Sequence, residues 1–95
     1  MQINAAIQLL PLATLQNRYS VVDKAISLIE KSGLNYKVCP FETVVEVNSE
    51  AIYHLIQQIQ AHILSDGCDE LILNVKIHAA NRNLSFSEKL LKYDL

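Results

Sequence analysis

The feature that most constrains the fold is a succession of patterns that occurs twice in this 95-residue chain. In each half an apolar–polar alternation lies next to a helical run, and the helical run ends in a short loop closed by Gly33 or Gly67. These two glycines are the only ones in the sequence. A glycine at such a place can take the left-handed conformation that ends many helices. The chain therefore divides into two similar halves, each with strands and one helix.

Alternation of side-chain character identifies the strands. Residues 2–10 alternate apolar and more polar side chains, and residues 71–78 repeat this pattern. A period of two is typical of a strand with one buried face. We expect Pro11 to end the pairing of the first strand, because proline has no N–H to donate to a sheet. Two shorter β-prone runs, residues 36–39 and 43–47, are joined by a proline-containing turn and predict a hairpin.

Helical periodicity places one helix in each half. In the first half, Ser20 is positioned to cap a helix whose apolar residues recur at i, i+3, i+4 and i+7, and this helix should stop at Ser32. In the second half, residues 52–63 keep the helical period for about four turns. Asn48 or Ser49 is the expected cap of that second helix.

Taken in order, these patterns predict β-α-β-β-α-β followed by a tail. Right-handed crossovers, with both helices on one face, favour the split βαβ arrangement. We therefore expect an α+β fold of the ferredoxin-like class, a four-stranded antiparallel sheet with two helices on one face. Residues 1–95 leave no room for a second domain. Within them, residues 79–95 should form a polar linker and a short C-terminal helix, capped by Ser85 with Glu88.

Composition favours a homo-oligomer. Hydrophobic residues make up 51% of the chain and charged residues 19%. A small domain buries a smaller share of its surface than a large one, so this sequence leaves apolar side chains outside. We expect pairing of sheet faces to cover Leu10, Val44 and Ile72.

Charge and cysteine usage narrow the partners and the compartment. The formal charge is −2, and the eight lysines and arginines are scattered, so nucleic acid is not an expected partner. No apolar run approaches the roughly 18 residues that cross a bilayer, so no membrane association is expected. Cys39 and Cys68 fall in different segments and form no disulfide framework. These features predict a cytoplasmic protein.

One sheet face is left for function. The apolar stripes of residues 2–10 and 71–78 should pack on the helices. The opposite face then receives a mixture of amides, one carboxylate, one ammonium and aliphatic groups: Asn4, Ala6, Gln8, Leu10, Val44, Glu46, Ile72, Asn74, Lys76 and His78. Such a mixture can line an aromatic heterocycle. The same pattern also fits a solvated or subunit-facing sheet, so both interpretations stay open.

Catalytic and metal-binding patterns are missing from the sequence. The three histidines, His54, His62 and His78, have no zinc-ligand spacing between them. No Gly-x-Ser-x-Gly elbow presents a nucleophile, and no glycine-rich loop could cradle a phosphate. Cysteines near strands are more often buried apolar groups than nucleophiles. We expect neither an enzyme nor a protein that carries a cofactor or metal.

Four short segments, taken together, point to a family. They are residues 8–12, 31–36, 40–46 and 75–78. In this order and spacing, over about residues 1–82, they resemble the thiamine-binding protein family. That family has a Pro-x-x-Thr turn followed three residues later by Glu, and it has a lysine in its last strand. The chain departs from the family at three positions, which are Gln8 for a common Ser, Glu42 for a common Gly, and His78 for an acidic residue.

The resemblance implies what the protein binds and how it assembles. The family's fold is ferredoxin-like, its members form dimers or tetramers through their sheets, and they bind thiamine or its hydroxymethylpyrimidine moiety without turnover. Thr43, Glu46 and Lys76 occupy the family's positions. An aminopyrimidine offers acceptors and a donor that Gln8, Thr43 and Asn74 could match, and Glu42 or Glu46 could offset the thiazolium charge. The expected ligand-binding residues are therefore Gln8, Glu42, Thr43, Glu46, Asn74 and Lys76.

Two functions from different classes follow from these observations. The first is non-catalytic binding of thiamine or hydroxymethylpyrimidine by a small homodimer or homotetramer. The second is a structural or regulatory homo-oligomer whose sheet face binds only protein. A cavity on the open face would favour the first, and a face filled completely by another subunit would favour the second.

Overall fold

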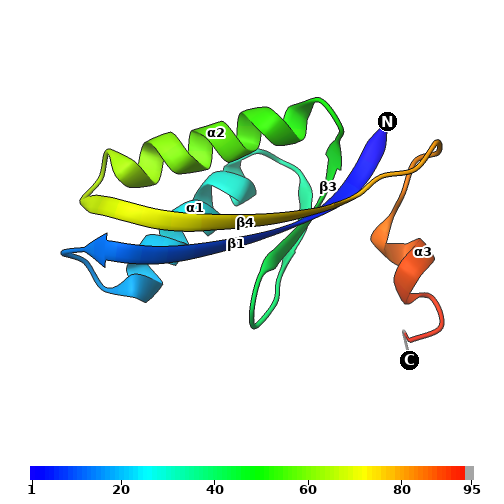
Figure 1. Cartoon of the computed structure of the whole chain (residues 1–95). Helices are drawn as coiled ribbons and strands as arrows, with labels where there is room; N and C mark the ends of the chain where they lie inside the picture. Colours follow the sequence, from blue (N-terminus) through cyan, green and yellow to red (C-terminus); the bar gives the residue numbers. More distant parts are fainter. Residues whose placement is uncertain (94–95) are drawn as a thin grey trace.

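The computed structural model describes residues 1–93 and contains four strands and three helices (Figure 1). In chain order they are β1 (Gln2–Thr14), α1 (Arg18–Lys31), β2 (Asn35–Val38), β3 (Thr43–Asn48), α2 (Ala51–Leu64), β4 (Cys68–His78) and α3 (Phe86–Leu90). The first six elements have the predicted β-α-β-β-α-β order. The predicted C-terminal helix is α3, and the last two residues of the predicted tail lie outside the described chain.

The strands form one antiparallel sheet in the order β2-β3-β1-β4. Helices α1 and α2 cover one face of this sheet, and the C-terminal segment with α3 stands apart from them (Figure 1). This arrangement confirms the ferredoxin-like class predicted from the sequence. In the register, Ala6 lies opposite Val44 on one side and Lys76 on the other. Three strands therefore contribute neighbouring side chains to the centre of the open face.

The core lies between the sheet and the two long helices. Its buried side chains include the predicted stripe of β1 and one face of each helix: Ile3, Ala5, Ile7, Leu9, Val21, Ala25, Ile29, Val45, Val47, Ile52, Leu55, Ile59, Ile63 and Cys68. The stripe of β4 is less buried, since Leu71 and Leu73 are only partly covered and Ile77 is 44% exposed. β4 is an edge strand and has neighbours on one side only, which explains this difference.

Pro11 does not end the first strand, so that prediction was wrong. β1 continues to Thr14, and Pro11 lies opposite Leu71 of β4. The pairing of β1 with β3 ends at Ile7, so beyond it β1 has a neighbour on one side only. Proline is tolerated where a strand has a free side, because no partner strand needs its missing N–H. The register shifts directly after Pro11, as expected for an irregular site.

The helix starts differ from the sequence prediction, whereas the helix ends agree with it. Asn17, not Ser20, caps α1, and its side-chain oxygen accepts from the Tyr19 N–H at 2.8 Å. α2 begins after Glu50, which makes no side-chain cap bond, so neither Asn48 nor Ser49 is its cap residue. The Asn48 side-chain oxygen accepts from the Glu50 N–H at 2.9 Å in the turn just before the helix. Burial of the apolar face of α2 stabilises this helix, so it forms without a side-chain cap.

The predicted glycines after α1 and α2 and the predicted Ser85 cap of α3 are all present. Gly33 and Gly67 have φ angles of 77° and 85°, the left-handed conformation that disfavours other residues. The Ser85 hydroxyl accepts from the Glu88 N–H at 3.2 Å at the start of α3. The sequence signals at these turns were therefore sufficient to place the ends.

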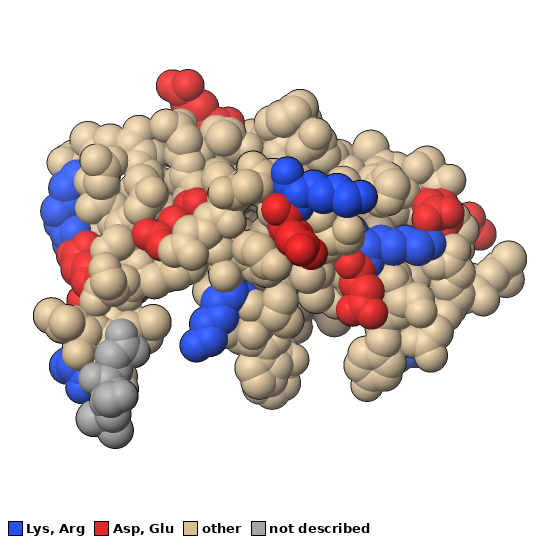
Figure 2. Space-filling view, turned by 180° about the vertical axis from the view of Figure 1, so that it is seen from behind, with Lys and Arg blue, Asp and Glu red and all other residues tan. Residues whose placement is uncertain are grey.

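The surface of the described chain carries charges of both signs. On the face shown in Figure 2, acidic and basic side chains lie among one another and form no broad patch of one sign. Within residues 1–93, no helix is long and apolar enough to span a bilayer.

Candidate functional site

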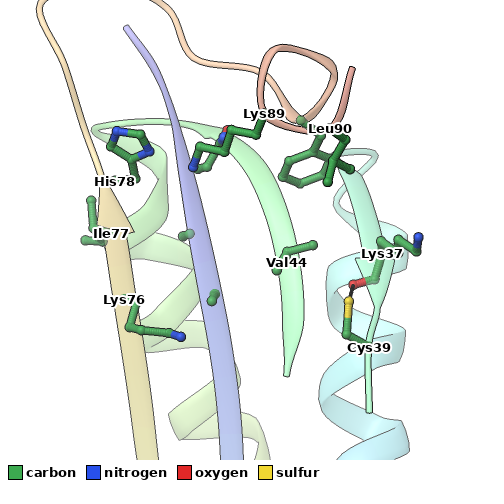
Figure 3. A pocket seen from close by; sticks show the side chains of 12 residues that line it. Lys37, Cys39, Val44, Lys76, Ile77, His78, Lys89 and Leu90 are labelled. Atoms are coloured by element: carbon green, nitrogen blue, oxygen red, sulfur yellow. Dashed lines mark hydrogen bonds between the residues drawn. The ribbon is translucent and has the colours of Figure 1, made fainter. Parts of the chain in front are cut away.

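A cavity of about 450 Å³ lies between the open face of the sheet and α3 (Figure 3). Its walls come from β1, β2, β3 and β4 and from the C-terminal helix. The lining residues are Asn4, Ala5, Ala6, Lys37, Cys39, Val44, Lys76, Ile77, His78, Phe86, Lys89 and Leu90. The open face therefore carries a ligand-sized hollow and is not flat.

The hollow exists because the central strand has small side chains there. Ala6 lies between Val44 and Lys76 in the sheet register, and its methyl group leaves the space above β1 empty. Phe86 and Leu90 of α3 also line the cavity, and Figure 3 shows Leu90 on the α3 side of it. An apolar floor and an aromatic wall suit a flat ring, which gains by leaving water on both faces.

The position of α3 is fixed by contacts with the start of β1. Leu84, directly before α3, is 1% exposed, and its N–H donates to the Gln2 carbonyl at 3.0 Å. The Gln2 side chain returns a hydrogen bond to the Leu84 carbonyl at 2.6 Å, and the Asn83 side chain accepts from the Gln2 N–H at 2.8 Å. The tail is therefore anchored to the sheet by buried packing and backbone bonds.

A buried amide lies at the edge of this cavity. Asn4 is 6% exposed, although it belongs to the open face. In the orientation that satisfies both amide atoms, its oxygen accepts from the Lys89 ammonium at 3.1 Å and its nitrogen donates to the Ile3 carbonyl at 3.2 Å. The contact from Lys89 joins α3 to the middle of the sheet face.

Of the six predicted ligand-binding residues, Lys76 lines the cavity. Its ammonium forms an ion pair with Glu42 at 3.2 Å. Glu42 therefore lies beside the cavity and holds Lys76. Glu46 also lies on the open face, but its carboxylate accepts hydrogen bonds from Gln2, at 2.8 Å, and from Asn35.

Gln8 and Asn74 form a neighbouring rung of the sheet. They lie directly opposite each other, and the Asn74 amide donates to the Gln8 side-chain oxygen at 3.2 Å. This pair is two residues along β1 from Ala6, on the same face. It borders the cavity but does not line it.

Thr43 is not brought together with the others. It lies opposite Ile7, whose side chain belongs to the core, and it is 6% exposed. Successive strand residues point to opposite faces, so Thr43 and Glu46, three residues apart, lie on opposite sides of the sheet. The structure thus places Thr43 toward the helices.

Sequence reasoning missed the residues that the tail contributes. Phe86, Lys89 and Leu90 line the cavity, yet the tail was expected only to form a short helix. The available signal was the apolar pair Phe86 and Leu90, which four-residue spacing puts on one face of a helix. Among residues 1–93, no three His, Cys, Asp or Glu side chains gather into a metal site.

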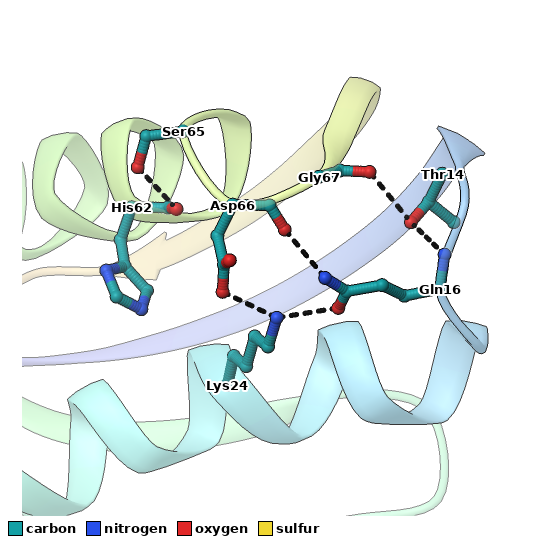
Figure 4. A network of polar contacts seen from close by, with 7 residues as sticks. All are labelled: Thr14, Gln16, Lys24, His62, Ser65, Asp66 and Gly67. Carbon is teal, nitrogen blue, oxygen red and sulfur yellow. Dashed lines mark hydrogen bonds and ion pairs between the residues drawn. The ribbon is translucent and has the colours of Figure 1, made fainter.

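A second polar cluster lies at the opposite end of β1 and joins two loops (Figure 4). The Lys24 ammonium of α1 contacts the Asp66 carboxylate at 2.5 Å and the Gln16 side-chain oxygen at 2.6 Å. The Gln16 amide in turn donates to the Asp66 carbonyl at 3.0 Å. Lys24, Gln16 and Asp66 each have protein partners in this cluster, so we interpret it as a structural clasp.

The clasp makes part of the folding stability depend on pH. The hydrogen bond from the Lys24 ammonium, and then the charge of Lys24, hold the pKa of the Asp66 carboxyl below its ordinary value. A carboxyl with a lowered folded-state pKa contributes stability above its unfolded pKa and loses it as pH falls through the folded pKa. We expect wild type to melt slightly above Asp66→Asn at neutral pH, with the difference shrinking progressively as pH falls below the ordinary carboxyl pKa of about 4. Thermal melts across this range test the prediction, and a constant difference would contradict it.

Comparison with known proteins decides the classification. The matching family is described as thiamine-binding protein, and the match covers residues 5–94. This chain belongs to the thiamine-binding protein family. The resemblance found in four short segments is therefore confirmed over almost the whole chain.

Two individual proteins are similar to this family member over most of their length. A UPF0045 protein of Clostridium perfringens is 31% identical over 90 residues, which is 95% of each chain. The structure of a domain of unknown function, DUF77, from Bacillus cereus is similar with a TM-score of 0.92 at 30% identity, covering 99% of this chain and 91% of that one.

A third similarity concerns the fold alone. The crystal structure of a Thermotoga maritima protein, for which a role in thiamine biosynthesis or salvage is suggested, is similar with a TM-score of 0.91. The identity is 23%, and the match covers 99% of this chain and 100% of that chain. The ferredoxin-like arrangement is thus shared at low sequence identity.

Proposed function

We propose that this protein binds thiamine or its hydroxymethylpyrimidine moiety without chemical turnover, in the cavity between the sheet and α3. The observation that carries the proposal is the cavity itself, since its volume of about 450 Å³ lies in the range of small-molecule sites. Membership of the thiamine-binding protein family supports the choice of ligand.

The cavity walls suit the aminopyrimidine ring. The ring would lie over Ala6, with Phe86 on its other side, and nearby polar groups would fix its orientation. Lys76 and the Gln8–Asn74 rung are the sequence-predicted residues best placed for this, and the buried Asn4 amide adds another polar group. Thr43 faces the helices and is not among the residues that line the cavity.

The same proposal states that the protein binds its ligand without catalysing a reaction. Among residues 1–93, the cavity is lined by one thiol, Cys39, and one imidazole, His78, and by no serine or carboxylate. A thiol nucleophile needs a base within hydrogen-bond reach, and the Cys39 thiol instead has the Lys37 carbonyl as its partner, at 3.9 Å. The family description, which names a binding protein, agrees with this interpretation.

Titration calorimetry of the purified protein tests the proposal. We expect saturable heat with thiamine or with hydroxymethylpyrimidine, and an increase in melting temperature that grows with ligand concentration, because a ligand that binds only the folded state stabilises it. Recovery of unaltered ligand by mass spectrometry would support binding without turnover. If neither compound gave heat or a thermal shift at about millimolar concentration, corresponding to about −4 kcal/mol, the proposal would fail.

A second candidate function rests on a different part of the same face. Leu10 and Ile72 lie opposite each other and are 38% and 43% exposed, and Leu12 is 54% exposed. We propose that these residues pair between copies of the chain and form a homodimer or homotetramer through the sheets. Val44 is only partly exposed and belongs to the cavity.

Light scattering separates the two candidates when combined with the titration. A homo-oligomer that binds the pyrimidine supports the first, whereas an oligomer that binds neither compound supports the structural or regulatory function. A monomer of 10.7 kDa at about micromolar concentration would contradict the assembly in both. We place the protein in the cytoplasm, where Cys39 and Cys68 would stay reduced, as both are free in the described structure.

A further inference from the structure

The charged groups around the cavity are mainly positive. Lys37, Lys76 and Lys89 line it together with His78, and among residues 1–93 no aspartate or glutamate does. Lys37 directs its ammonium away from the cavity, whereas the ammonium groups of Lys76 and Lys89 extend toward β1 (Figure 3). Two of the three lysines can therefore reach a ligand that lies on the strand.

Two carboxylates of the sheet, those of Glu42 and Glu46, already have partners. Glu42 forms its ion pair with Lys76, and Glu46 accepts hydrogen bonds from Gln2 and Asn35. Neither carboxylate lines the cavity. A cationic thiazolium would therefore meet only carboxylates that already have protein partners, and the expected role of Glu42 or Glu46 toward its charge stays a prediction.

Lys89 has a different kind of partner. Its contact at 3.1 Å is the amide oxygen of Asn4, which is neutral. Among residues 1–93, the ion pairs are Lys24–Asp66, Lys76–Glu42 and Arg82–Glu88, and Lys89 takes part in none of them. An ammonium with an uncharged partner, at the rim of an apolar hollow, is well suited to accept an anion from a ligand.

We propose that the preferred ligand is a phosphomonoester of the aminopyrimidine, with its phosphate at Lys89 and within the field of Lys76. This inference rests on the proposed function and specifies the ligand's charge. The ring would occupy the apolar hollow over Ala6, and the phosphate would replace the Asn4 oxygen, or share it, as the partner of Lys89. The cavity should therefore bind an anionic pyrimidine more tightly than a neutral or cationic one.

Four compounds separate the contribution of the ring from that of the charge. They are hydroxymethylpyrimidine, its monophosphate, thiamine and thiamine monophosphate, each titrated into the full-length protein under identical conditions. We expect hydroxymethylpyrimidine monophosphate to bind at least about tenfold more tightly than hydroxymethylpyrimidine, as one charge-assisted hydrogen bond would give. Thiamine monophosphate carries its phosphate on the thiazolium side, away from the pyrimidine ring, so its gain over thiamine should be smaller. Inorganic phosphate alone should bind far more weakly, because it lacks the ring.

Salt and substitution identify the source of the preference. It should shrink from about 0.1 M to about 1 M salt, because the screening length falls from about 10 Å to about 3 Å. Lys89→Gln should remove most of the preference, measured as the ratio of the affinities for the phosphomonoester and the unphosphorylated pyrimidine, whereas Lys89→Arg should keep this ratio. Lys92→Gln is the matched control, since Lys92 lies near Lys89 in sequence, does not line the cavity and has its ammonium 5.1 Å from the Tyr93 ring centre.

The possible failures are distinguishable. If hydroxymethylpyrimidine bound as tightly as its monophosphate, or if Lys89→Gln kept the preference, the ligand charge would be wrong and the proposed function would stand. Equal binding of inorganic phosphate and the phosphomonoesters would also overturn the inference, since the ring would then contribute nothing. If none of the four organic compounds bound, the proposed function itself would fail.

Discussion

Replacing Ala6 by phenylalanine is expected to weaken ligand binding by about 100-fold or more, a loss of about 2.7 kcal/mol or more. Ala6 lines the cavity between Val44 and Lys76, and only its small side chain leaves the hollow open. A phenyl ring would fill the space in which the ligand ring should lie. The open face is not the core, so the melting temperature should change little.

Ala13→Phe is the matched control for that substitution. Ala13 belongs to the same strand, is exposed and does not line the cavity. Calorimetric titration and thermal melting of the three proteins measure both effects. Normal binding by Ala6→Phe would show that the ligand lies elsewhere, and parallel losses of binding in both variants would indicate a general disturbance of β1.

Ile59→Ala is expected to lower the free energy of unfolding by about 2–5 kcal/mol. Ile59 is 0% exposed and lies on the face of α2 that packs against the sheet. Its truncation removes apolar contacts and leaves a space that the surrounding side chains only partly fill. Because a domain of this kind is stabilised by about 5–15 kcal/mol in total, this single change removes a large share.

Urea denaturation measures this loss, and Leu15→Ala provides the control. Leu15 is 99% exposed, so its truncation should change the free energy of unfolding by less than about 0.5 kcal/mol. The slope of the unfolding free energy with urea should stay the same in both variants, so that the midpoints report stability. Equal midpoints for Ile59→Ala and Leu15→Ala would contradict the assigned core.

Most of the fold could be predicted from the sequence because its signals are local. Alternation gave the strands, and a glycine that must adopt positive φ gave the end of each long helix. The helix starts were less predictable, since Asn17 and Ser20 are both good caps and neighbouring packing decided between them. Pro11 was misjudged because the free side of β1 depends on where β3 ends.

Less of the candidate site could be predicted. Strand parity identified the open face and brought Lys76, Gln8 and Asn74 to it, and the register confirms that these three share one face. The same parity argues against grouping Thr43 with Glu46, because an odd separation puts the two residues on opposite faces. That grouping followed the resemblance to the family and not the pleat of the strand.

The sequence by itself determined the class of fold, the two sheet faces and the family, because periodicity, glycine positions and collinear motifs are properties of the chain order. Only the tertiary structure decided that the tail returns to the open face, where Leu84 packs and α3 closes a cavity over Ala6. It also decided that Glu42 is paired with Lys76 and that Lys89 contacts Asn4. Such contacts join residues more than thirty positions apart, and no local pattern encodes which distant side chains meet.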